Sequence, residues 1–348
     1  MADALISPAV GGVFWGISAG ILAYSARNMR KNFDSSLVPL MGVLGAFVFA
    51  AQMINFTIPV TGSSGHLGGG MMLAILLGPQ AAFMTIASVL SVQALFFADG
   101  GLLALGCNIF NMGFFPCFLA YPFIYKPLVG NIPTQKSILI ASLVSSVLGL
   151  QLGALSVVLE TVSSGISSLP FSTFALLMQP IHLGIGIVEG LITAAVVGFV
   201  YHARPEIMAI NAARPSYALK KVVTVFAVLA LCTGGVLSWF ASSHPDGLEW
   251  SIAAVTGQDT LEAPKDQTHE TLAAVQEKTA IMPDYAFKAA LPAASDAAVE
   301  AETEAAPWPA VDSGTSTAGI VGGMLTLLLA GLAGRLLGRR KSVTHERH

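Results

Sequence analysis

Two apolar segments near the beginning of the chain are separated by the stretch Thr61-Gly62-Ser63-Ser64-Gly65-His66-Leu67-Gly68-Gly69-Gly70. Five of these ten residues are glycine, and His66 is the only histidine in the first 180 residues. Glycine tolerates positive φ and lets other groups come close to the backbone. Beside an apolar segment, such a break lets non-helical backbone line a cavity instead of facing lipid. We therefore predict a small polar site centred on His66, with the remaining helices forming its wall.

The composition indicates a membrane protein. Of the 348 residues 54% are apolar and 11% are charged, whereas a soluble domain carries about 25% charged residues. Repeated apolar segments of about 18 or more residues predict transmembrane helices. We place spans at residues 8–26, 36–55, 67–79, 80–98, 101–125, 137–160, 172–202, 220–241 and 317–337. The predicted fold class is an all-α integral membrane protein, with a seven-helix body followed by a two-helix C-terminal hairpin.

The positions of the basic residues predict the orientation in the membrane. Fourteen of the seventeen Lys and Arg residues fall in the loops after the odd-numbered spans or in the C-terminal tail. The other three lie in the long loop before the last span. Short loops rich in Lys and Arg face the cytoplasm. We therefore expect a multi-pass protein of the plasma (cell inner) membrane, with its N-terminus outside and its C-terminus in the cytoplasm.

Residues 242–315 differ from the rest of the chain because they carry thirteen Asp and Glu residues. Low hydrophobicity combined with like charge predicts a long, flexible extracytoplasmic loop. Two islands interrupt it, Pro-Asp-Gly-Leu-Glu at 245–249, which has turn chemistry, and Met-Pro-Asp-Tyr at 282–285. On this basis we divide the chain into a membrane domain, 1–214, and a C-terminal domain, 215–348.

Several polar residues lie inside the apolar segments, where they are costly. Asn108 and Asn111 are three residues apart and share a helix face, as do His182 and Glu189, which are two turns apart. Such residues either hold helices together by hydrogen bonds or mark a pathway, and Glu189 fits a pathway and a pairing with His182 equally well. We expect Glu160, at the outer end of its span, to be solvated. The candidate supporting residues are Asn55, Ser64, Asn108, Asn111, His182 and Glu189.

Two other functions fit parts of this pattern. Gly62, Ser64 and Gly65 have the Gly-x-Ser-Gly form of rhomboid intramembrane proteases, and His182 is a possible base for Ser64. That pattern is short and arises easily in a loop rich in Gly and Ser. A secondary transporter that carries protons on Glu189 is the other alternative, but it is expected to contain an internal repeat, and we find none.

Stretches in one order along the first 200 residues resemble a known family. They read VPLMGVL (38–44), FAAQMINF (49–56), GSSGHL (62–67), DGGLLALG (99–106), NIFNMG (108–113), HLGIG (182–186) and EGLIT (189–193). The chain resembles the CbiM/NikM family, the metal-capturing membrane subunits of energy-coupling factor (ECF) importers for cobalt and nickel. Its C-terminal part resembles the PDGLE domain, through residues 245–249, the Pro-Asp-Tyr island and the last span.

The resemblance implies a non-catalytic permease subunit. It would capture Co²⁺ or Ni²⁺ outside the cell, for cobalamin synthesis or for nickel enzymes, with no further cofactor. Its partners would be an ECF transmembrane coupling subunit, ABC ATPase subunits that hydrolyse ATP, and the lipid bilayer, without nucleic acid.

The resemblance also implies metal ligands. In the family, an N-terminal Met-His start and a loop histidine equivalent to His66 place four nitrogens in a plane, which suits Ni²⁺ or, less strictly, Co²⁺. This chain begins Met1-Ala2-Asp3. We expect either a true start two residues earlier or a weaker site made of the Met1 amine, Asp3 and His66.

Overall fold

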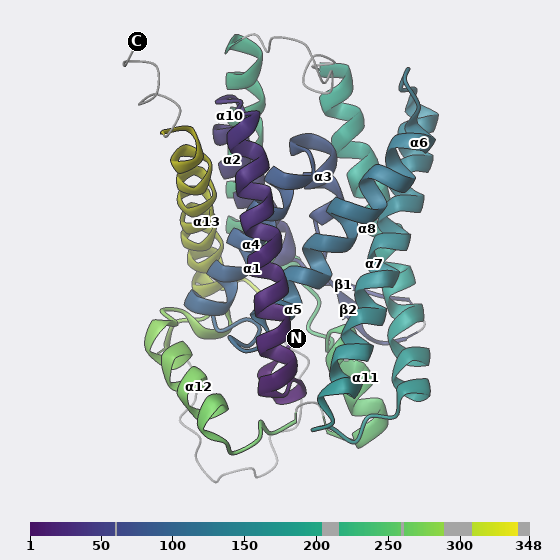
Figure 1. The fold of residues 1–348 in the computed structure, drawn as a ribbon, viewed down its shortest axis with the longest axis vertical. Coiled ribbons are helices and arrows are strands. Elements are labelled where there is room, and N and C mark those ends of the chain that lie inside the picture. The colour runs from purple at the N-terminus through teal and green to yellow at the C-terminus, as the bar shows by residue number, and fades with distance from the viewer. Residues whose placement is uncertain (60, 204–215, 259–260, 289–307, 340–348) are drawn as a thin grey trace.

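The computed structural model describes all residues except 60, 204–215, 259–260, 289–307 and 340–348. Among the described residues, six segments are long and apolar enough to cross a membrane: α1 (Pro8–Lys31), α4 (Pro79–Phe96), the continuous segment Leu105–Val129, α7 (Gln135–Ser164), α8 (Phe171–Ala203) and α13 (Ser313–Arg339). Three further helices are α2 (Leu37–Gln52), α3 (Gly70–Leu77) and α10 (Ser216–Gly235). Each of the nine predicted spans coincides with one of these segments, and the all-α membrane fold is confirmed (Figure 1).

The segment Leu105–Val129 changes its helical form along its length. It begins as α5 (Leu105–Ile109), continues as a π-helix (Phe110–Tyr125) that contains two prolines, and ends as α6 (Lys126–Val129). Proline cannot donate the main-chain hydrogen bond that a regular α-helix needs at that position. The wider π-turn lies where these prolines interrupt the α-helical pattern.

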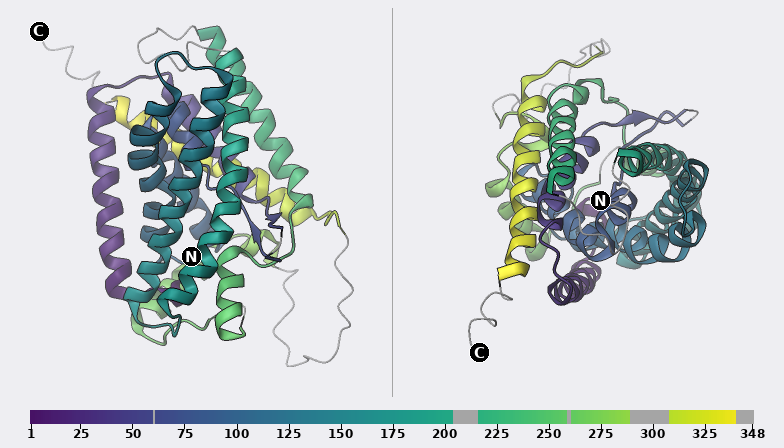
Figure 2. Two further views of the ribbon diagram at one scale, coloured as in Figure 1. Left: turned by 90° about the vertical axis from the view of Figure 1, so that its right-hand side faces the viewer. Right: turned by 90° about the horizontal axis from the view of Figure 1, so that it is seen from above.

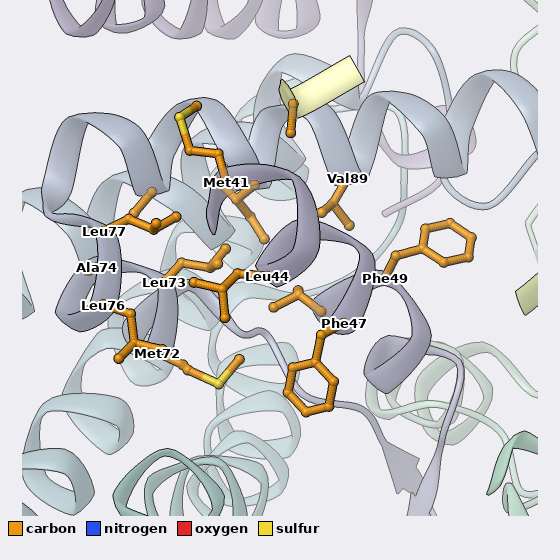
Figure 3. Close-up of a cluster of buried hydrophobic side chains, with 14 of the residues drawn as sticks. Met41, Leu44, Phe47, Phe49, Met72, Leu73, Ala74, Leu76, Leu77 and Val89 are labelled. Carbon is orange, nitrogen blue, oxygen red and sulfur yellow. The ribbon is translucent and has the colours of Figure 1, made fainter. Parts of the chain in front are cut away.

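The centre of the protein is formed by α2 and α3, which are apolar on every side. All eight residues of α3 and most of α2 are buried. Figure 3 shows Met41, Leu44 and Phe47 of α2 beside Met72 and Leu73 of α3. A helix that is hydrophobic all round belongs in a core. The outer helices instead expose large apolar side chains, as expected where lipid surrounds them, for example Leu176, Phe199 and Leu328.

The glycine-rich stretch turns the chain back into the body between α2 and α3. Two short antiparallel strands, β1 (Phe56–Thr57) and β2 (Ser64–Gly65), form the turn. Gly69 then takes a φ of 74° directly before α3, a left-handed conformation that glycine adopts without steric cost. Non-helical backbone therefore reaches into the protein at His66, as we predicted.

The C-terminal hairpin packs its two helices, α10 and α13, against each other and against α2. Both lie on the side of the molecule away from α7 and α8 (Figure 2). At the crossing, a Cβ atom added to Gly319 would lie 2.3 Å from the carbonyl oxygen of Gly234. Small residues let helices approach this closely. Ser316 joins the helices further, because its hydroxyl donates to the Gly235 carbonyl at 2.8 Å.

The described part of the acidic loop differs from the flexible segment that we predicted. It contains two helices, α11 (Gly247–Thr256) and α12 (Gln267–Thr279), at the same end of the molecule as the N-terminus (Figure 1). Asp246 and Asp266 cap their first turns by accepting main-chain N–H groups, and such caps stabilise a helix by about 1 kcal/mol. Average composition missed these local signals. The acidic run at 300–304 lies outside the described residues.

We predict that Gly319→Ala loosens the C-terminal hairpin. The added methyl would overlap the Gly234 carbonyl, so the helices must separate, and overpacking of this kind costs about 1–3 kcal/mol. The measurement is the thermal unfolding temperature in detergent. Gly331→Ala on the same helix is the control, because nothing lies within 4 Å of its added Cβ. Equal shifts in both variants would contradict the packing argument.

Candidate metal site

A cavity of about 140 Å³ lies beside His66. Segments far apart in the sequence contribute the polar part of its wall: Met1, His66, Asn108, Asn111, His182 and Asp246. The structure thus brings together the two predicted ligand positions, Met1 and His66, with three of the expected supporting side chains. It also adds Asp246, from the turn before α11, which we did not consider as part of a site.

The half-buried ring of His66 has one nitrogen engaged and one available. Its Nδ1 lies 3.1 Å from the carbonyl oxygen of Leu67. A carbonyl oxygen can only accept, so this contact places the proton on Nδ1 and leaves a lone pair on Nε2. Neutral imidazole with a free ring nitrogen is the form that binds metal ions.

Glu189 anchors the loop that carries His66. Its Oε2 accepts the main-chain N–H of Gly68 at 2.7 Å, and the Gly68 carbonyl accepts from the side-chain amide of Gln52 at 2.9 Å. Gln93, a residue that we did not single out, donates to Gln52 at 2.9 Å. The loop peptide is therefore held on both sides by buried side chains. Glu189 contacts the loop backbone rather than pairing with His182, whose Nδ1 lies 2.8 Å from the Met178 carbonyl.

Ser64 ties the same loop to the C-terminal region. Its hydroxyl donates to the His244 carbonyl at 2.8 Å, and its main-chain N–H donates to the Pro245 carbonyl at 2.8 Å. A serine that donates to a main-chain carbonyl has no base to activate it, so the geometry gives the protease reading no support. Asn55 lies beside this junction rather than at the cavity, and its carbonyl accepts the Ser242 N–H at 2.7 Å.

The N-terminal segment reaches the same cavity through a different set of contacts. The Met1 carbonyl accepts the Gly101 N–H at 3.2 Å and the Asn108 side-chain amide at 3.3 Å. Asp3 accepts the Ala104 N–H at 2.8 Å, so its carboxylate is engaged with this turn rather than with the cavity. Leu5 and the next residue are buried beneath them. These contacts carry Met1 to the cavity wall.

Asn111 leads to a buried acid that we expected to be solvated. Its amide donates to Oε2 of Glu160 at 2.8 Å, and the Ser156 hydroxyl donates to the other oxygen at 3.0 Å. Glu160 is only 2% exposed, so the expectation of a solvated cap is wrong. The reason is that α7 continues to Ser164, which places Glu160 inside the bundle instead of at its edge.

The described residues hold no group of three or more His, Cys, Asp and Glu side chains that could bind a metal ion. An ion in this cavity would therefore need at least one donor from outside that set. The N-terminal amine is such a donor, and Met1 lines the same cavity as His66. The arrangement fits a site that combines one imidazole with main-chain nitrogen.

Comparisons with known proteins identify the family to which the chain belongs. The family model described as "Cobalt uptake substrate-specific transmembrane region" (CbiM) matches residues 1–207, and the PDGLE domain model matches residues 220–339. The fused nickel transport protein NikMN of Archaeoglobus fulgidus is 34% identical to this chain. The match covers 66% of this chain and 74% of the length of that protein.

Two further matches cover different lengths of the chain. The fused nickel transport protein NikMN of Rhodobacter capsulatus is 29% identical over 82% of this chain and 87% of its own. A crystal structure of a truncated transition metal transporter superimposes with a TM-score of 0.52 and 31% identity, over 58% of this chain and 98% of that one. The chain therefore belongs to the CbiM/NikM family of cobalt and nickel transport proteins, with a PDGLE domain fused to its C-terminal side.

Proposed function

We propose that this protein is the substrate-capture subunit of an ECF importer and that it binds Ni²⁺ or Co²⁺ outside the cell. The observation that carries the proposal is that Met1 and His66 line one cavity. The positions of the Lys and Arg residues predict that the N-terminus, and so this cavity, faces the outside of the cell. The loop histidine and the N-terminal segment are held by separate sets of hydrogen bonds. Neither set needs an ion to form.

The chemistry proposed for the site is nitrogen ligation without catalysis. His66 supplies the free Nε2 and the Met1 amine supplies a second donor. A Met-His start would replace the Met1 amine with its own amine and add the amide and imidazole nitrogens of its histidine. Imidazole and amine nitrogens suit nickel and cobalt, and a planar set of four suits Ni²⁺ best. Asn108 and Asn111 support the site without binding the ion, Asn108 through the Met1 carbonyl and Asn111 through Glu160. The printed names of the two fused relatives favour nickel.

The direction of transport and the partners complete the proposal. We place the domain boundary near residue 215, and the family matches at residues 1–207 and 220–339 support this division. An ECF coupling subunit and ABC ATPases on the cytoplasmic side would supply the energy, since the sequence contains no P-loop of its own. The metal would reach the cavity from the outer face.

Reporter fusions test the orientation. Fusions at residues 30, 130, 210 and 345 should report a cytoplasmic location, and fusions near residue 280 should report the outside, because the basic loops stay in the cytoplasm. Paired alkaline phosphatase and fluorescent protein fusions give the measurement. A cytoplasmic signal near residue 280 would contradict the nine-span arrangement.

Glu189→Gln tests the support of the His66 loop. Replacing the carboxylate weakens its hydrogen bond to the Gly68 N–H, and losses behind a metal site typically reduce affinity about 10–100-fold. We expect Ni²⁺ binding to weaken but to persist in equilibrium dialysis. His202→Gln, at the other end of the same helix, is the control. If Glu189→Gln abolishes binding while His66→Ala does not, the assigned roles are reversed.

His66→Ala tests the ligand itself. Removing the imidazole should abolish metal uptake by cells, while the protein still inserts and assembles, because the Gly68 contacts hold the loop without that ring. Since the ligand imidazole must be deprotonated, binding to the intact protein should also weaken as the pH falls. Uptake of radioactive nickel, with membrane content measured by immunoblot, gives the result.

Two versions of the chain test the N-terminal ligands. We compare the chain beginning at Met1 with a chain that has Met-His added before Met1, by equilibrium dialysis with Ni²⁺ and Co²⁺. Tight binding is expected only in the extended chain, together with an absorption spectrum of bound Ni²⁺ typical of a planar four-nitrogen site. Equal binding by both chains, unchanged by His66→Ala, would place the site elsewhere.

A further inference from the structure

His269 is a buried residue on an otherwise polar helix of the C-terminal region. It is the one buried residue of α12 and is 3% exposed. Its Nδ1 lies 2.6 Å from Oδ2 of Asp266. Its Nε2 lies 3.1 Å from the carbonyl oxygen of Ile6 and 3.2 Å from that of Asp3. The ring therefore joins α12 to the N-terminal segment, more than 260 residues away in the sequence.

The neighbours of His269 make its ring a double donor. Carboxylate and carbonyl oxygens accept hydrogen bonds, so both ring nitrogens are best satisfied when each carries a proton. Burial opposes the charged form, but the hydrogen bonds that the ring donates to Asp266 and to the Ile6 carbonyl outweigh it and raise the pKa of His269. The ring thus binds the turn Asp3–Leu5 and its flank through two main-chain acceptors at once.

Helix α12 also contacts the loop residue next to the one that binds Met1. The side-chain amide of Gln276 donates to the Gly100 carbonyl at 2.7 Å and to the Ala94 carbonyl at 2.9 Å. The next residue, Gly101, donates its N–H to the Met1 carbonyl at 3.2 Å. Helix α12 therefore holds the N-terminal turn with one side chain and the loop beneath Met1 with another.

We propose that His269 is a positioning residue for metal capture, which holds the turn Asp3–Leu5 so that the N-terminal segment stays at the wall of the cavity that His66 also lines. The proposal rests on the proposed function, because it assumes that the N-terminal segment supplies a ligand. His269 itself would not touch the ion, since both of its nitrogens are already engaged. Its effect passes through the two carbonyls that it holds.

The test compares His269→Ala and His269→Gln in the version of the full chain that binds Ni²⁺ more tightly. Glu270→Ala is the matched control, because it changes the exposed neighbouring residue on the same helix. Two quantities are measured, the affinity for Ni²⁺ alone by equilibrium dialysis and amide hydrogen exchange by mass spectrometry. The exchange is followed at residues 1–7 and 99–104, with α2 as the reference segment.

The expected result separates positioning from general stability. His269→Ala should bind Ni²⁺ about 10–100-fold more weakly, the usual effect of losing a residue that supports metal ligands. Exchange should quicken at residues 1–7 and 99–104 but not in α2. His269→Gln, whose amide still donates to a carbonyl, should recover part of both effects, and Glu270→Ala should behave as the unchanged chain.

Two results would overturn the proposal. One is unchanged Ni²⁺ affinity in His269→Ala. The other is weaker binding with faster exchange throughout α2 and no recovery in His269→Gln, which indicates a general loss of stability. His66→Ala is measured alongside, so that a failure of the proposed metal site can be distinguished from a failure of the role proposed for His269. If His66→Ala loses binding and His269→Ala keeps it, only this inference fails; if His66→Ala keeps binding, the proposed site fails.

Discussion

The main-chain N–H and carbonyl of Gly68 are the constraint on which the arrangement of the site depends. Gly68 lies in an apolar interior, where an unpaired N–H or carbonyl costs about 1–3 kcal/mol. Glu189 of α8 accepts its N–H and Gln52 of α2 donates to its carbonyl. Because His66 is only two residues away, the position of its ring follows from the packing of these two helices. The wall of the cavity and the loop that enters it are thus one hydrogen-bonded unit.

The part of the cavity wall that contains Met1 is held by other hydrogen bonds. There the N-terminal segment is held by Asn108 and by the main chain of residues 101–104. The C-terminal region is in contact with both parts, through Ser64 and Pro245 at one and through His269 at the other. The distance between the two candidate ligands therefore reflects the docking of the C-terminal region as well as the packing of the membrane helices.

Hydropathy and charge predicted the membrane helices well, because burial in lipid is a property of whole segments. The glycine-rich break also predicted a polar site centred on His66, and His66 lines a cavity in the structure. The contacts that hold the site were harder to predict. Glu160 and Gln93 are buried because of neighbours on other helices, and the pairing of Ser64 with Pro245 joins residues about 180 apart. No local pattern encodes such contacts, although the aspartates before α11 and α12 were recognisable helix caps.

The junction between Ser64 and residues 244–245 consists of a few hydrogen bonds, each worth about 1 kcal/mol net. Between two separate proteins, so few bonds would leave most molecules apart at cellular concentrations. Within one chain the second partner is always nearby, because α10 and α13 pack against α2, and linked binding partners reach effective concentrations in the millimolar range. Fusion of the two regions thus keeps a weak contact closed that would not by itself hold two separate proteins together.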